Sequence, residues 1–320
     1  MLTRREFGKA VAGSLAAASV AWSQTKLTRN SSQFGGVHVG AITYCYRSLR
    51  DANEAWSREA VDRLMDRTVA AYVENRIDLA EFWIAFVEPP GGPGRGPTDP
   101  VARENLRKWR VARPLDVFER ARKKFEDAGI QIYSCMANLS DDLTDDEIEA
   151  VFDFAKTLKT NIISANCTTA SIKRAAPFAD RHKVYVSAHS ENAPFDRNPD
   201  GMAYEKNLVQ ALSYSPYMRV TLDTGHFTAF GGDAVKFVDQ HFDRMANLHL
   251  KDRLRRAEDR NDANTPEWGK GDAPIKEVLR LMKQRRASFP ACIEYEYNGK
   301  GTAVQEVQKC LDYAKAALVT

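Results

Sequence analysis

The sequence lacks several features that would place it in well-known classes of protein. No strand-like segment is followed by a glycine-rich phosphate-binding motif, which argues against a dinucleotide-binding open sheet. The five cysteines show neither CxxC nor zinc-ribbon spacing, so we expect buried thiols rather than a disulfide framework. The net charge is only +3, from 46 basic and 43 acidic residues that are interspersed along the chain. This balance offers no basic surface for nucleic acid, and no nucleic-acid partner is expected.

A long apolar run is missing as well. Near the N-terminus, Arg4 and Arg5 precede the small-residue run AVAGSLAAASVA, which ends at Ala21. This arrangement resembles a twin-arginine export signal with cleavage after Ala21, and the run is too short to span a bilayer as a stable helix. We therefore predict an export signal over 1–21, a polar linker over 22–36 and a periplasmic or otherwise exported protein without stable membrane insertion. An amphipathic leader or a misassigned start is the alternative.

The remaining residues, 37–320, alternate between strand-like and helix-like segments eight times. An apolar share of 43% and an aromatic share of 10% suffice for a sizeable core. Eight repeats of a strand and a crossover helix predict an α/β fold, a (β/α)8 TIM barrel in a single domain, with a doubly wound open sheet as the competitor. The expected strands cover 37–46, 77–86, 130–137, 161–167, 183–189, 220–223, 246–251 and 291–296. The expected helices cover 58–75, 101–109, 114–129, 144–158, 172–181, 204–214, 232–242, 274–285 and 303–318.

One segment is too rich in proline and glycine for regular structure. Residues 88–100 read EPPGGPGRGPTDP and follow the second predicted strand. This pattern predicts a long loop at the ligand-binding face of the barrel, and a disordered insertion without functional weight is the alternative.

Polar side chains gather at the C-terminal ends of the last predicted strands. Asp223 ends one strand, His249 and Lys251 share one face of the next, and Glu294 and Glu296 share one face of the last. Ligands bind at this end of a parallel barrel, and charges that face its interior need partners. Singly, such residues are ordinary buried or capping groups. Together, Asp223, His249 and Glu294 predict a site for one divalent metal ion.

The motifs LDTGH, NLHLKD and CIEYE, in this order, resemble the xylose-isomerase-like TIM-barrel superfamily, often named the sugar phosphate isomerase/epimerase family. The resemblance extends over 37–320. It implies Asp223, His249 and Glu294 as metal ligands and His226 as a substrate contact.

The same resemblance extends to the segments that follow these motifs. It implies Arg255, six residues past His249, as a basic substrate-binding residue. Trp268 belongs to a glycine turn, WGKG, that relatives also carry, and we expect it on the substrate side.

The fourth metal ligand is the point where this sequence departs from its relatives. They carry Glu or His at the end of the strand equivalent to 183–189, as E-N-H or H-x-H. Here VSAHSEN places Ser187 at the first position and His189 at the second. We assign His189 as the fourth ligand, and a water molecule or Glu191 could instead fill the gap. Mixed nitrogen and oxygen ligation favours Mn, Co, Zn or Fe over Mg.

The function that this resemblance implies is an exported, metal-dependent sugar isomerase or epimerase. It would remove a proton next to a carbonyl, with the metal as Lewis acid. The candidates for proton transfer are Glu294, Glu296, Lys251 and His226. The expected contacts to a small-molecule sugar or sugar derivative are His226, Arg255, Trp268 and Glu81, the last near the end of the strand 77–86.

Several alternatives remain open at this point. The chemistry also suits a lyase or dehydratase on a keto-glycoside or inosose-like substrate, and a non-catalytic sugar-binding barrel is a third reading. A DNA-repair endonuclease on the same barrel would need more histidine ligands than six histidines supply, and a basic face. A homo-oligomer is compatible with the sequence.

Overall fold

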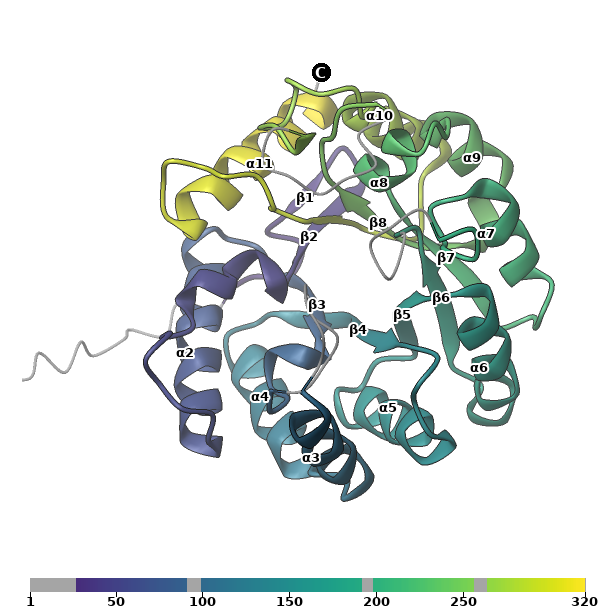
Figure 1. Cartoon of the computed structure of the whole chain (residues 1–320). Helices are drawn as coiled ribbons and strands as arrows, with labels where there is room; N and C mark the ends of the chain where they lie inside the picture. The colour runs from purple at the N-terminus through teal and green to yellow at the C-terminus, as the bar shows by residue number, and fades with distance from the viewer. Residues whose placement is uncertain (1–26, 91–98, 192–197, 256–263, 320) are drawn as a thin grey trace, which may run out of the picture.

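Eight parallel strands close into a barrel at the centre of the molecule (Figure 1). The computed structural model describes residues 27–90, 99–191, 198–255 and 264–319. The predicted export signal, the linker up to residue 26 and residues 91–98 of the Pro/Gly segment lie outside the described residues. The strands follow one another in chain order, and the last one pairs back with the first, so the predicted TIM barrel is confirmed.

Strands and helices alternate along the chain as predicted. The strands are β1 (Gln33–Phe34), β2 (Val37–Ile42), β3 (Leu79–Trp83), β4 (Gln131–Leu139), β5 (Ile162–Cys167), β6 (Tyr185–His189), β7 (Met218–Asp223), β8 (Met245–Leu250) and β9 (Ala291–Ile293). The helices are α2 (Arg58–Glu74), α3 (Pro100–Val111), α4 (Leu115–Asp127), α5 (Asp145–Thr157), α6 (Thr169–His182), α7 (Glu205–Leu212), α8 (Thr224–Ala229), α9 (Ala234–Gln240), α10 (Ile275–Arg285) and α11 (Ala303–Val319). The short β1 pairs antiparallel with the start of β2.

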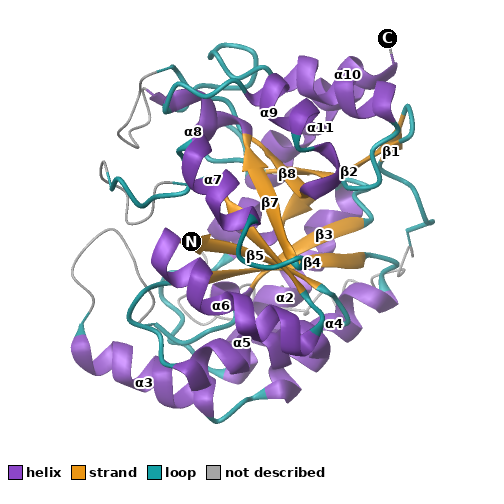
Figure 2. Ribbon diagram, turned by 90° about the vertical axis from the view of Figure 1, so that its right-hand side faces the viewer, coloured by secondary structure: helices purple, strands orange, loops and turns teal. Residues whose placement is uncertain are grey.

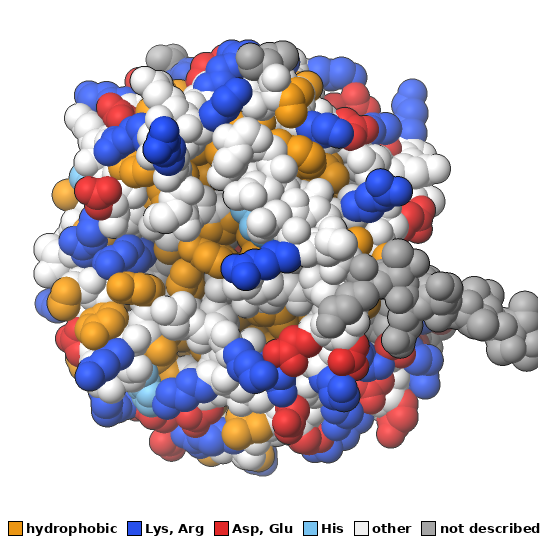
Figure 3. All heavy atoms as spheres, turned by 180° about the vertical axis from the view of Figure 1, so that it is seen from behind, with side chains coloured by type: hydrophobic (Ala, Val, Ile, Leu, Met, Phe, Trp, Pro, Cys, Tyr) orange, Lys and Arg blue, Asp and Glu red, His pale blue; other side chains and the backbone are white. Residues whose placement is uncertain are grey.

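The helices form an outer ring around the strands (Figure 2). Their apolar faces pack against the outward faces of the strands and form a continuous hydrophobic core. All five cysteines are buried free thiols. The face opposite to that of Figure 1 carries acidic and basic side chains interspersed around exposed hydrophobic groups (Figure 3). Among the described helices, none combines the length and the apolar character needed to cross a membrane.

Several predicted strands end earlier than expected, and two of them continue into 3-10 turns. β2 ends at Ile42 and is followed by a 3-10 helix over Thr43–Leu49, and β3 ends at Trp83 before a 3-10 turn over Ile84–Phe86. At this rim the Thr43 side chain accepts the Trp83 N–H, so the side chain replaces a sheet hydrogen bond. The residues that were predicted to continue these two strands therefore belong to the 3-10 segments at the end of the barrel.

The segment LDTGH continues into a short helix rather than an open turn. The Asp223 carboxylate accepts the backbone N–H of His226 at 2.7 Å and caps the first turn of α8. α8 begins directly after β7 and therefore keeps His226 close to the end of that strand.

The predicted capping box of Thr144 and Glu147 at the start of α5 is also present.

Candidate metal centre

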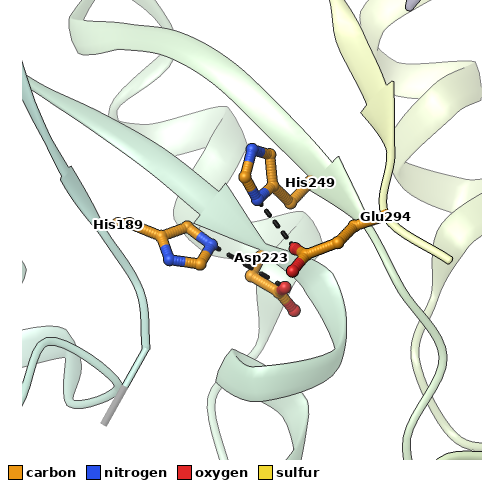
Figure 4. A group of neighbouring side chains, drawn as sticks. All are labelled: His189, Asp223, His249 and Glu294. Atoms are coloured by element: carbon orange, nitrogen blue, oxygen red, sulfur yellow. Dashed lines mark hydrogen bonds and ion pairs between the residues drawn. The ribbon is translucent and has the colours of Figure 1, made fainter. Parts of the chain in front are cut away.

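Four potential ligands meet at the C-terminal end of the barrel (Figure 4). His189, Asp223 and His249 come from β6, β7 and β8, and Glu294 follows β9, so four consecutive strands contribute. One ligand atom from each side chain lies within 4.8 Å of all the others, and all four residues are buried. The structure therefore brings together the four residues that the sequence predicts as metal ligands.

His249 lies between two carboxylates. Its Nδ1 is 2.8 Å from Oε2 of Glu294, and its Nε2 is hydrogen-bonded to the carboxylate of Glu81. Burial alone would lower the pKa of His249, but the charges of Glu81 and Glu294 outweigh it and raise the pKa to about 10. Without a metal the ring of His249 is a cation that bridges the carboxylates of Glu81 and Glu294. Because Glu81 holds Nε2, Nδ1 of His249 is turned toward the other ligands.

Glu81 does not reach the substrate side of the site, contrary to the prediction. Its side chain is fully buried below His249 in the barrel interior. The carboxylate also accepts hydrogen bonds from Ser134 at 2.9 Å, Ser164 at 2.5 Å and Asn247 at 3.2 Å. With these partners fixed, Glu81 orients the ring of His249, as carboxylates commonly do for metal-binding histidines.

Ser187 lies deeper in the barrel than the four ligands. Its hydroxyl is 2.8 Å from that of Thr221, which in turn is 3.0 Å from that of Ser164. His189 follows two residues later on the same inward face and sits at the level of Asp223. Ser187 therefore leaves no ligand missing from the group, because His189 lies in the same layer of the barrel as the other ligands.

Glu191 was the other candidate for the fourth ligand, and it lies on the wrong side of His189. Its carboxylate is 3.7 Å from Nδ1 of His189, whereas Nε2 of that ring faces Asp223 at 3.8 Å. Glu191 also approaches Nε2 of His226 to 3.7 Å.

The residues present fit a metal ion. Within the described part of the chain, Nε2 of His189 is buried without a hydrogen-bond partner, and so is Oδ2 of Asp223, although the ammonium of Lys251 lies 3.1 Å from that oxygen. Burial, followed by the charge of His249, lowers the pKa of His189, so its ring is neutral and offers a lone pair. An unsatisfied buried polar atom costs about 1–3 kcal/mol, which a bound cation would offset. Two imidazoles and two carboxylates form a donor set typical of transition metals.

Lys251 supplies positive charge beside the four ligands. Its Nζ is 2.9 Å from Oε1 of Glu294, 2.9 Å from Oε2 of Glu296 and 3.1 Å from Oδ2 of Asp223. Burial opposes the charged form, but Asp223, Glu294 and Glu296 outweigh it and raise the pKa of Lys251 well above its usual range. The protonated amine is suited to donate hydrogen bonds rather than to accept a proton.

His226 sits between two cations. Its Nε2 is 3.1 Å from Nζ of Lys251, and its Nδ1 is 3.0 Å from a guanidinium nitrogen of Arg253. Burial and then these two charges lower the pKa of His226 well below its usual range, so the ring is neutral. Both neighbours only donate, and a neutral imidazole accepts only one hydrogen bond.

Arg253 is a site residue that the sequence reasoning missed. Its side chain is almost completely buried and reaches His226. The alternation that puts His249 and Lys251 on one face continues to Arg253, although β8 itself ends at Leu250. That alternation is the signal that could have found it.

Arg255 and Trp268 do not join the four ligands. Arg255 is exposed, and its backbone N–H donates to Asp272. Trp268 is 9% exposed and packs edge-on against Tyr313 of α11, with ring centroids 6.0 Å apart. Both residues lie in the loop before α10, and their role as substrate contacts stays a prediction.

Asp252 explains the glycine turn of that loop. Its buried carboxylate accepts the backbone N–H groups of Gly269 at 2.7 Å, Gly271 at 3.0 Å and Ala273 at 3.1 Å. A Cβ at Gly271 would lie only 2.2 Å from this carboxylate, so the position requires glycine. The turn fixes the loop that follows β8.

Comparison with known proteins agrees with this architecture. The model of the xylose isomerase-like TIM barrel family matches residues 165–315, a segment that contains all four ligands. No curated protein matches the sequence.

Three solved structures share the fold over most of the chain. The probable 3-DHS dehydratase from Bacillus anthracis has a TM-score of 0.59 at 16% identity, covering 86% of this chain and 98% of its own. A D-psicose 3-epimerase, solved in the presence of D-fructose, has a TM-score of 0.58 at 12% identity and coverages of 88% and 100%. The 3-keto-D-glucoside 4-epimerase from E. coli has a TM-score of 0.56 at 10% identity and coverages of 88% and 99%. The chain is thus similar to the xylose isomerase-like TIM barrel family over residues 165–315, and its closed barrel has the fold that the motifs predicted.

Proposed function

We propose that this chain is a metal-dependent isomerase or epimerase that acts on a sugar or sugar derivative. The observation that carries the proposal is the group of four buried ligands on consecutive strands, at the end of the barrel where ligands bind. The names of two structural neighbours, a D-psicose 3-epimerase and a 3-keto-D-glucoside 4-epimerase, support a sugar as substrate.

His189, Asp223, His249 and Glu294 would hold one divalent metal ion. Their mixed nitrogen and oxygen atoms favour Mn, Co, Zn or Fe over Mg. Bound there, the metal would polarise substrate oxygens and so acidify a neighbouring C–H bond.

Glu296 is the best candidate for the base that removes this proton. Glu294 has one oxygen on His249 and the other on Lys251, and it belongs to the ligand group. Glu296 lies outside that group, its side chain is 12% exposed, and Lys251 holds it at 2.9 Å. A positioned carboxylate of this kind serves as a general base in proton abstraction.

Lys251 and His226 would assist from the same side. The ammonium of Lys251 can donate to a substrate oxygen on which negative charge develops, in a region that excludes water. The neutral ring of His226, which accepts a hydrogen bond from one of its two cationic neighbours, would help to hold that neighbour beside the substrate.

A lyase or dehydratase is the second candidate, and one observation favours it. Ser187 stands where the E-N-H relatives carry a glutamate, and the group of four contains only two carboxylates, Asp223 and Glu294. Epimerisation exchanges a proton on both faces of a carbon, whereas β-elimination needs a single base. The Bacillus anthracis neighbour is named a probable dehydratase.

Metal analysis tests the centre. We expect the purified protein to hold close to one transition metal ion per chain, and Asp223→Ala and Glu294→Ala to lose it. Glu296→Gln is the matched control, because it should keep the metal and lose turnover. Full metal content in both alanine variants would contradict the proposed ligands.

Turnover of candidate substrates tests the reaction. The metal-loaded protein is incubated in deuterium oxide with free sugars and with 3-keto sugars, and products are followed by NMR. Deuterium next to the carbonyl with an epimer or isomer supports the first candidate, and an unsaturated product supports the lyase. Sugar binding without any exchange would instead identify a non-catalytic sugar-binding barrel.

We further propose that the enzyme works outside the cytoplasm. The support is the pair Arg4-Arg5 ahead of the short small-residue run that ends at Ala21, in a segment outside the described residues. Export would make phosphorylated sugars poorer candidates than free sugars or glycosides.

A further inference from the structure

We propose that Asn166 is the positioning residue that makes His189 a metal ligand. The inference rests on the proposed metal centre. Asn138 of β4, Asn166 of β5 and His189 of β6 lie on three neighbouring strands, with Asn138 and Asn166 in register. Asn166 contacts both neighbours: its Nδ2 is 2.9 Å from Oδ1 of Asn138, and its Oδ1 is 2.7 Å from Nδ1 of His189.

These two contacts determine which ring nitrogen of His189 carries the proton. Asn166 donates through its amide nitrogen to Asn138, so its amide oxygen faces the ring. An amide oxygen only accepts, and Nδ1 of His189 must therefore be the N–H. A neutral imidazole has one N–H, so Nε2 carries the lone pair.

The lone pair is directed at the other ligands. Nε2 of His189 is buried, has no hydrogen-bond partner among the residues that the structure describes, and lies 3.8 Å from Oδ2 of Asp223. In Figure 4 this edge of the ring faces Asp223. A metal ion shared with Asp223 and Glu294 would meet a nitrogen that is ready to coordinate.

Without Asn166 the ring would lie between two carboxylates at similar distances, with Glu191 3.7 Å from Nδ1 and Asp223 3.8 Å from Nε2, so the charges alone would not fix the tautomer. The carboxylate of Asp223 attracts an N–H, and a proton on Nε2 would satisfy it directly. In that tautomer Nε2 has no lone pair, and His189 could not bind a metal. A carboxylate ligand would need no such control, so the role of Asn166 follows from the histidine of this chain.

The test combines metal affinity with a direct measurement of the tautomer. Asn166→Leu removes the acceptor at similar volume, and Asn166→Asp keeps an acceptor toward Nδ1. Ile163→Val, on the outward face of the same strand, is the matched control for packing. Cobalt(II) affinity is measured from its visible absorption, and the protonated nitrogen of His189 is identified by NMR of the metal-free protein at mildly alkaline pH.

We expect the parent to carry the proton on Nδ1 and Asn166→Leu to show a mixture of both tautomers, with part of the proton on Nε2. Asn166→Leu should bind cobalt about 10–100-fold more weakly, the usual effect of losing a residue that orients a metal ligand. Asn166→Asp and Ile163→Val should bind like the parent. If Asn166→Leu fails to fold, Asn138→Leu replaces it with the same expected direction, because the amide of Asn166 then loses its orientation.

Two results would overturn the inference and leave the metal centre standing. One is parent-like cobalt affinity in Asn166→Leu, and the other is a proton on Nε2 of His189 in the parent. A parent that binds no cobalt at all would refute the metal centre, and this inference with it.

Discussion

Ser187 and His189 occupy the same inward face of β6, two residues apart, yet they belong to different layers of the barrel. Ser187 is part of a chain of hydroxyls with Thr221 and Ser164 that leads to Glu81. His189 lies one layer higher, among the metal ligands. A carboxylate at position 187 would therefore enter the hydroxyl layer and not the ligand group.

This difference predicts the effect of Ser187→Glu. The sequence alone suggests that a glutamate there restores a missing ligand and strengthens metal binding. The structure reverses this expectation: the new charge would be buried without a cation, which costs about 3–5 kcal/mol. We expect chemical denaturation to show this loss and metal affinity to stay at or below that of the parent. Ser187→Ala is the control, with a loss of about 1 kcal/mol for one hydrogen bond.

Period-two alternation predicted the residues of the site well, because it depends only on strand geometry. It placed His249 and Lys251 together and set Glu294 beside them. It could not assign Glu81, whose partner His249 is 168 residues away in the chain. It also could not give the height of Ser187, because the hydrogen bonds to neighbouring strands set that height.

At the scale of elements, the described parts of the Pro/Gly segment are held by buried ion pairs. Glu88, the first residue of the segment, binds Arg110 of α3 through two contacts of 2.6 and 2.8 Å. Arg110 also lies 3.5 Å from Glu147 at the start of α5, and Arg103 of α3 contacts the same carboxylate. The segment therefore begins and ends on a fixed base beside the barrel, which the proline and glycine content alone could not indicate.

Arg110→Leu should destabilise the protein strongly. The variant leaves the carboxylate of Glu88 buried without its cation, at a cost of about 3–5 kcal/mol. Arg107→Leu is the matched control on the same helix, because its pair with Glu104 is exposed and worth less than about 1 kcal/mol. Urea denaturation of both variants measures the difference, and equal stabilities would contradict the assigned role of the buried pair.

Most element types were predictable, whereas the short helix α8 and the ends of several strands were not. Thr43–Tyr46 was predicted as the end of a strand but begins a 3-10 helix. The hydroxyl of Tyr72 donates to the carbonyl of Ala41, and Thr43 accepts from Trp83, so tertiary contacts end β2 at the rim. Such contacts come from distant residues and leave no periodic signal in the sequence.

At the scale of the whole molecule, the proposed export leads to a testable prediction. Replacing Arg4 and Arg5 by lysine should keep the protein in the cytoplasm, because a twin-arginine signal needs the arginine pair. Arg29→Lys, which lies past the signal, should be exported normally. Cell fractionation with immunodetection measures both, and equal periplasmic recovery of the double variant and its parent would argue against this route.

The pairing of β2 with β9 joins the two ends of the barrel, and the site depends on the completed ring. The four ligands come from β6 to β9, the last strands of the chain, while Glu81, which orients His249, comes from β3 on the other side of the interior. A refolding chain can assemble this arrangement only after the ring has closed. The rate of metal uptake during refolding would then report the rate of barrel closure, because the ion binds tightly only after β2 has paired with β9.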